Sequence, residues 1–109
     1  MSTPAHVQIA TTLPDRPAAD ALARRLLEAR LVACVQILGP VASHYWWQGR
    51  IDSAEEWLCL AKTTGARQAE AQAAIRAAHP YEVPEIVVTP ILTGLPDYLR
   101  WIDEETAPR

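Results

Sequence analysis

The segment His79-Pro80-Tyr81-Glu82-Val83-Pro84-Glu85-Ile86, called the octapeptide below, separates a predicted helix from a predicted strand. Each proline fixes its own φ, lacks an N–H donor and pushes the preceding residue toward extended backbone. A helix from Ala66 to about Ala78 therefore ends at the octapeptide, and a β-branched strand over Glu85 to Thr89 follows, closed by Pro90. The stiff backbone holds one imidazole, one phenol and two carboxylates, so we expect function here.

Toward the N-terminus, the sequence predicts a strand followed by an amphipathic helix. Val7, Ile9 and Thr11 alternate with other residues, which is typical of a half-buried strand. Asp15 is placed to cap a helix that runs to about Ala29, with a proline tolerated in its first turn. The apolar stripe of this helix consists of Ala19, Leu22, Ala23, Leu26 and Ala29.

The middle of the chain predicts a long β-hairpin. Val32 to Leu38 is apolar, Gly39-Pro40 interrupts the run, and Val41 to Trp47 continues in extended form. Gln48-Gly49-Arg50 forms the turn, because the glycine can supply a positive φ. On the return strand, one face carries Trp57, Cys59 and Ala61, and the other carries Leu58, Leu60 and Lys62.

A last helix is predicted from about Pro96 to Glu105, with Asp97 placed favourably against the helix dipole. The order β-α-β-β-α-β plus a C-terminal helix predicts an α+β, ferredoxin-like fold: an antiparallel sheet with helices on one face. We expect residues 1–109 to form a single domain. The hairpin is long for so small a domain, and exposed strand edges favour pairing with another subunit, so we expect an oligomer.

Composition excludes several classes of partner. The net charge is −3 and no basic cluster occurs, so neither nucleic acid nor an anionic membrane is an expected partner. No apolar run approaches the length of a membrane span, and the first residues do not resemble a signal peptide. Cys34 and Cys59 form no C-x-x-C pair, and we expect both to be reduced and buried in a soluble, cytoplasmic protein.

The octapeptide carries the first candidate site. His79 offers a borderline-soft nitrogen, and Glu82 and Glu85 offer hard oxygens, a ligand set that suits Cu(II) or Zn(II). The alternative is that the imidazole caps the preceding helix while the prolines only shape a loop. Spacing alone leaves both interpretations open, since no H-x-x-x-H or C-x-x-C pattern strengthens the metal interpretation.

The aromatic run Tyr45-Trp46-Trp47 is the second candidate site. Strand alternation places Tyr45 and Trp47 on one face and Trp46 on the other, so neither face of this arm can be fully solvated. Burial against a neighbouring subunit and stacking on a ligand both remain open. The chain has no phosphate-binding glycine loop and no nucleophile elbow, and we therefore do not expect an enzyme.

Several separated motifs occur together in this chain. They are Leu31-Val32-Ala33-Cys34-Val35, Ser43-x-Tyr45-x-Trp47-x-Gly49, Lys62-Thr63, the octapeptide and Pro96-Asp97-Tyr98-Leu99-x-Trp101. In order and spacing they resemble the CutA family, the divalent-cation tolerance proteins, over nearly the whole chain. Arg50 stands where that family commonly has lysine, and Trp46 replaces a more polar residue.

The resemblance implies a ferredoxin-like subunit, similar to the PII signalling proteins, assembled into a compact homotrimer. It also implies a link to copper and other divalent cations. The family's motif residues map onto four candidate metal ligands: His79, Glu82, Glu85 and Cys34. Positions associated with the cleft between subunits are Tyr45, Trp47, Lys62, Tyr81 and Tyr98.

Two functions follow as hypotheses. The leading one is a metal-binding or tolerance protein without turnover, with no obligatory cofactor and with Cu(II) or another divalent cation as ligand. The alternative is a PII-like sensor that binds a small anionic molecule between subunits, with Lys62 as the anchoring charge. For the metal we rank His79 above Cys34, because burial of a thiol raises its pKa and hinders ligation.

Overall fold

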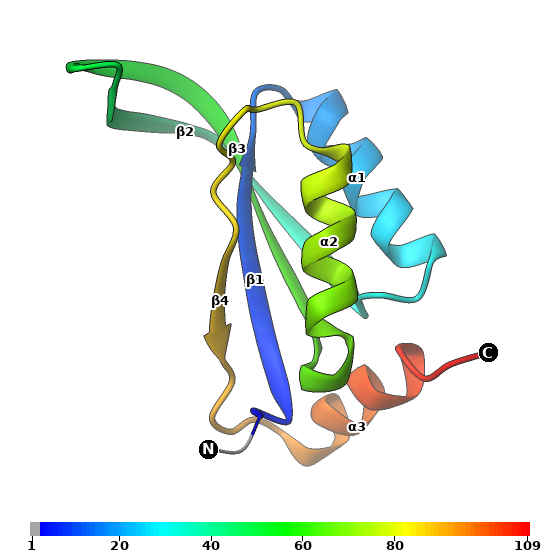
Figure 1. The fold of residues 1–109 in the computed structure, drawn as a ribbon. Helices are drawn as coiled ribbons and strands as arrows, with labels where there is room; N and C mark the ends of the chain where they lie inside the picture. The colour runs from blue at the N-terminus through cyan, green and yellow to red at the C-terminus, as the bar shows by residue number, and fades with distance from the viewer. Residues whose placement is uncertain (1–2) are drawn as a thin grey trace.

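The computed structural model describes residues 3–109 and arranges them as a twisted sheet with two helices on one face and a third at one end (Figure 1). The elements are β1 (His6–Leu13), α1 (Arg16–Glu28), β2 (Cys34–Trp47), β3 (Arg50–Thr64), the 3-10 turn η1 (Gly65–Arg67), α2 (Gln68–Ala78), β4 (Val87–Pro90) and α3 (Pro96–Glu105). The strands pair antiparallel in the order β2-β3-β1-β4. This is the ferredoxin-like topology that the sequence predicts.

The core lies between the sheet and the pair α1 and α2. Val7 and Ile9 of β1 are fully buried, and the predicted stripe of α1 packs on them through Leu22 and Leu26. The Asp15 carboxylate accepts the Ala18 N–H at 2.8 Å, which satisfies one of the donors that a helix leaves free at its start. The expected stripe extended to Ala29, but this residue follows the helix and is exposed.

Three predicted boundaries shift by a few residues. Arg50 belongs to β3, opposite Trp47, so the turn has two residues, Gln48 and Gly49, with φ of 51° and 80°. The second helix starts later than Ala66, because η1 precedes it and only Gln68–Ala78 is α-helical. The last strand starts at Val87 rather than Glu85, because the chain before it crosses toward β3 instead of pairing with β1.

The second face of the sheet, which we call the open face, points away from α1 and α2 (Figure 1). Strand alternation gives it the residues that do not face the core. They include Gln8, Ala10 and Thr12 of β1, Cys34, Gln36 and Leu38 of β2, and Leu58, Leu60 and Lys62 of β3. Leu38 is 47% exposed, so this face offers apolar as well as polar surface to a partner.

Beyond the end of β1, strands β2 and β3 continue alone as a two-stranded extension, the hairpin arm, formed by residues 41–56. Pairing of β1 with β3 ends at Leu13 and Trp57, whereas β2 and β3 pair for seven more positions. At about 3.3 Å per residue the arm projects about 20 Å. The radius of gyration, 14.5 Å, accordingly exceeds the roughly 13 Å expected for a compact chain of this length.

Candidate metal and ligand sites

His79 follows the last residue of α2, and hydrogen bonds occupy both of its ring nitrogens. Nε2 lies 2.9 Å from the Thr12 carbonyl oxygen and 3.1 Å from Thr11 Oγ1, while Nδ1 accepts the Tyr81 N–H at 3.2 Å. Because a carbonyl can only accept, Nε2 carries the proton, and the ring is the neutral tautomer. Burial lowers the pKa of His79 below 6.5, with a smaller contribution from the Arg76 charge, against the opposing effects of the Thr12 carbonyl and Glu56.

The two carboxylates of the octapeptide do not join His79 in a preformed site. Glu82 and Glu85 are both exposed, and the carbonyl oxygen of Glu82 accepts from Arg76 Nη2 at 3.2 Å. Across residues 3–109, no group of three histidine, cysteine, aspartate or glutamate side chains is placed to hold a metal ion. A metal on His79 would have to displace the Tyr81 N–H or the Thr12 carbonyl, and the metal assignment stays a prediction.

Cys34 is partly exposed, so the expectation that it is buried is wrong. It begins β2 on the open face, where α1 and α2 do not reach, and its Sγ lies 3.5 Å from Tyr98 Oη of α3. The contact with Cys34, together with partial burial, raises the pKa of the Tyr98 phenol. Cys59 faces the core as expected, and burial raises the pKa of its thiol to about 11.

Lys62 stands directly across from Cys34 on the neighbouring strand. Its Nζ donates to Gln36 Oε1 at 2.7 Å, and no carboxylate of the described chain forms an ion pair with it. Lys62 and Tyr98, two of the residues expected in the cleft, therefore lie with the candidate ligand Cys34 at one end of the open face. The cluster pairs a thiol with an ammonium group whose charge no carboxylate neutralises.

The two groups of candidate residues lie at opposite ends of β1. Lys62 pairs with Gln8 near the start of β1, whereas His79 bonds to Thr12 four residues further on. At about 3.3 Å per residue the two positions are about 13 Å apart along the strand. A single chain therefore does not bring Cys34 and His79 to one metal ion.

Glu56 is a residue of the site that the sequence interpretation missed. It is 7% exposed, and its Oε2 accepts a hydrogen bond from Tyr81 Oη at 2.8 Å. Burial and the bond to this carboxylate raise the pKa of the Tyr81 phenol far above its ordinary value. Strand alternation could have drawn attention to it, since a carboxylate that shares a strand face with Leu58 and Leu60 needs a partner.

The aromatic residues of the hairpin arm are exposed in the single chain. Tyr45 is 40% exposed and Trp47 is 39% exposed. Trp46 is 72% exposed, and Ile51, its partner on the neighbouring strand, is 66% exposed. Both faces of the arm thus carry uncovered aromatic surface, as the sequence predicts. An isolated two-stranded hairpin is marginal in water, and the described chain leaves much of the aromatic surface of this arm uncovered.

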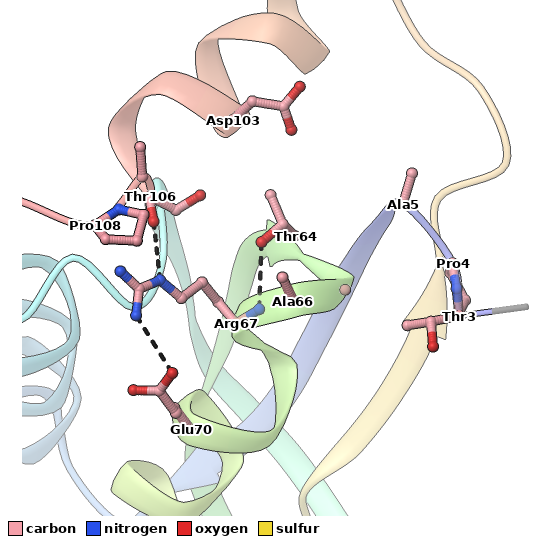
Figure 2. Close-up of a pocket in the computed structure, with 12 residues that line it drawn as sticks. Thr3, Pro4, Ala5, Thr64, Ala66, Arg67, Glu70, Asp103, Thr106 and Pro108 are labelled. Carbon is pink, nitrogen blue, oxygen red and sulfur yellow. Dashed lines mark hydrogen bonds and ion pairs between the residues drawn. The ribbon is translucent and has the colours of Figure 1, made fainter.

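A separate depression of about 740 Å³ opens between the start of β1, η1 and the end of α3 (Figure 2). Arg67 lies in it with most of its side chain covered, donating through Nε to the Thr106 carbonyl at 2.9 Å and through Nη1 to Glu70 at 3.3 Å. Of the described residues that line it, none belongs to the predicted site. The first bond ties the end of α3 to η1 and the second ties η1 to α2, so Arg67 has a structural role.

The fold and these side chains define a small ferredoxin-like protein, with polar groups on an uncovered sheet face and a projecting aromatic arm. Residues 7–105 match the family model described as CutA1 divalent ion tolerance protein. The chain belongs to this family.

Similar proteins come from distant organisms. The divalent-cation tolerance protein CutA of Archaeoglobus fulgidus is 41% identical over 99 residues, covering 91% of this chain and 96% of that protein. The protein of the same name from Thermus thermophilus is 42% identical over 95 residues, with coverage of 87% and 92%. A solved structure from A. fulgidus, described as the periplasmic divalent cation tolerance protein CutA, superposes with a TM-score of 0.91 at 40% identity, covering 94% and 99% of the two chains.

Proposed function

We propose that this chain binds a divalent cation, copper in particular, as a homotrimer and without catalytic turnover. One observation carries the proposal: the candidate ligands Cys34, Glu82 and Glu85 reach the surface of the single chain, yet no three such groups within residues 3–109 converge on one point. Since these side chains are exposed but too far apart to hold one ion together, side chains from a second subunit would be needed to complete a metal site. Membership of the divalent-cation tolerance family supports the choice of ligand.

The homotrimer is supported by the surface that a single chain leaves uncovered. The open face and the hairpin arm together expose Leu38, Trp46 and Ile51, and burial of apolar surface contributes about 25 cal/mol per Å². Sedimentation at micromolar concentration should give about three times the 12.0 kDa chain mass. Trp47 is 39% exposed in the single chain, and the proposed interface would bury this surface. Trp47→Ala should therefore weaken assembly and lower the melting temperature, because truncation of a buried aromatic ring costs about 3–5 kcal/mol. A stable wild-type monomer would contradict the proposal.

The ligands are tested by copper titration of three variants against the wild-type protein. Cys34 is the more accessible candidate, because its thiol is partly exposed while both ring nitrogens of His79 are already bonded. We therefore compare Cys34→Ser and His79→Ala, with Cys59→Ala as the matched control, since that thiol is buried in the core. Loss of a ligand should weaken binding by roughly tenfold or more, a cost of about 1.4 kcal/mol or above.

Each outcome identifies a different site. Weaker binding in His79→Ala assigns the imidazole, and such binding should decline at low pH, since a protonated ring cannot ligate. Weaker binding in Cys34→Ser alone assigns the thiol and favours Cu(I) over Cu(II). Equal affinity in both variants and in Cys59→Ala would exclude both residues as ligands.

A second function, PII-like sensing of a small anion, has one observation in its favour. Lys62 carries its charge beside Cys34 and Tyr98, and its hydrogen-bond partner is the neutral amide of Gln36. An ammonium group without a carboxylate partner is a natural anchor for a carboxylate or phosphate ligand. Calorimetry with nucleotides and small carboxylates tests this: binding lost in Lys62→Gln but kept in Cys34→Ser would favour it over metal binding.

We place the protein in the cytoplasm, where a reduced Cys34 would persist. None of the helices in the described part of the chain is long and apolar enough to cross a membrane. The structure from A. fulgidus is described as periplasmic, so cell fractionation of the organism that makes this chain is the deciding measurement.

A further inference from the structure

The hairpin arm joins the sheet at a point where the β-ladder is interrupted. The register between β2 and β3 shifts between Leu38 and Val41, so the residues between them drop out of the regular pairing. Gly39 lies in this gap and packs directly under the indole of Trp57, where any Cβ would overlap the ring. A break in one strand lets the arm bend, and such irregularities commonly redirect a strand.

The arm loses its neighbouring strand at the same point. The last pair between β1 and β3 is Leu13 with Trp57, and Glu56 is the first residue of β3 beyond it. In Figure 1 the chain that follows α2 crosses the sheet here, close to where the arm leaves it. The octapeptide therefore reaches the base of the arm, at the point where β1 stops pairing with β3.

Glu56 and Tyr81 make the contact between these two parts. The carboxylate is 7% exposed and accepts the Tyr81 hydroxyl at 2.8 Å. A buried carboxylate is unfavourable unless it is paired, and a hydrogen bond to a charged group is stronger and more directional than a neutral one. An apolar residue would satisfy packing alone at this position, so the polar pair adds a fixed direction.

The contact is anchored on β1. The Tyr81 N–H donates to His79 Nδ1, the two rings lie 4.9 Å apart, and His79 Nε2 bonds to the Thr12 carbonyl. A chain of polar contacts thus runs from the end of β1, through the octapeptide, to the base of the arm. Pro80 and Pro84 limit the backbone conformations of the octapeptide, which contains both His79 and Tyr81.

We propose that the Tyr81–Glu56 hydrogen bond is a latch that fixes the angle of the hairpin arm against the sheet. With the latch closed, the arm is held in one orientation before it meets a neighbouring subunit, so less freedom is lost on assembly. Both residues are positioning residues, acting on the arm rather than on a ligand. The latch acts within one chain, so it does not require the proposed homotrimer or a bound metal.

Hydrogen exchange of the intact protein tests the latch. Tyr81→Phe removes only the hydroxyl, and Glu56→Gln keeps a buried acceptor of the same shape. Backbone amides of the arm should exchange about tenfold or more faster in Tyr81→Phe, the factor expected from losing one hydrogen bond to a charged group, while amides of α1 stay unchanged. Glu56→Gln removes the charge but keeps an acceptor, so it should speed exchange in the arm less than Tyr81→Phe does. Tyr98→Phe is the matched control, since it removes a phenol hydroxyl far from the arm.

A double variant separates the latch from general destabilisation. Once Tyr81→Phe has opened the latch, adding Glu56→Gln should change exchange in the arm no further. Unchanged arm amides in Tyr81→Phe, or equal acceleration in the arm and in α1, would overturn the proposal. Failure of the trimer proposal would appear separately, as a wild-type protein that sediments at the mass of one chain.

Discussion

Ile102 makes the buried apolar contact between α3 and the rest of the molecule. Its side chain is fully buried, whereas Tyr98 and Trp101 on the same helix are 40% and 37% exposed. Ile102→Ala removes three carbon atoms from the core, which at about 0.8 kcal/mol per methylene is roughly 2.4 kcal/mol before any cavity term. With the cavity included we expect a loss of about 3 kcal/mol, within the observed range of about 2–5 kcal/mol for such changes.

The ion pairs of α3 cannot compensate for that loss. His6 Nε2 lies 2.8 Å from Asp103, and Arg30 Nη1 lies 2.7 Å from Glu105, but Asp103 is 55% exposed and both Arg30 and Glu105 are partly exposed. Exposed pairs contribute about 0–1 kcal/mol each. Ile102→Ala should therefore loosen α3 more than removal of either pair does.

The assay combines guanidinium unfolding with thiol labelling. When α3 loosens, Tyr98 leaves the Cys34 thiol, so Cys34 should react faster with a disulfide reagent while the buried Cys59 still reacts slowly. Ile102→Val is the matched control and should cost only about 1 kcal/mol. A loss below 1 kcal/mol in Ile102→Ala, with unchanged labelling of Cys34, would refute the role given to Ile102.

Three further predictions concern pH and the turn. The pKa of Cys59 rises from 9.0 to about 11 on folding, so the protonated thiol contributes its full stability below pH 9 and loses it as the pH rises through 11. The free energy of unfolding should therefore fall by up to about 3 kcal/mol over this alkaline range. In Cys59→Ala the free energy of unfolding should depend less on pH in the same range. The pKa of His79 is lowered in the folded chain, so the unfolded chain takes up the proton first and the free energy of unfolding should fall as the pH drops below 6.5. If the melting temperature of His79→Gln depends on pH as strongly as that of the wild type, this explanation is wrong. Gly49→Ala should lower the free energy of unfolding by about 1 kcal/mol, because the backbone φ of +80° disfavours a residue with a Cβ. No atom lies within 4 Å of the added Cβ, so a clash contributes nothing. A much larger loss in thermal unfolding would contradict this explanation.

Local chemistry determined most of the fold from the sequence. The capping carboxylate of Asp15 starts α1, and proline stops α2 before Pro80, because these effects act between residues that are near in the chain. The period-two pattern likewise identified the buried residues of β1 and separated the two faces of β3, of which the structure buries the one with Cys59 and Ala61. The element order then left the ferredoxin-like arrangement as the favoured topology.

The sequence misplaced features that depend on pairing between distant segments. The start of β4 and the exposure of Cys34 were both predicted incorrectly. The strand begins late because the octapeptide has already turned toward β3, and the thiol stays accessible because the helices cover the other face of the sheet. Neither fact is encoded in the neighbouring residues.

By itself, the sequence determined the helices, the strands, their order and the residue types able to bind a cation or an anion. Only the tertiary structure decided which of those residues meet. It separated Cys34 from His79 along β1, placed Lys62 beside Cys34, and joined Tyr81 to the unanticipated Glu56. The physical reason is range: caps, turns and periodicity act over a few residues, whereas a site forms where the sheet register brings remote side chains together.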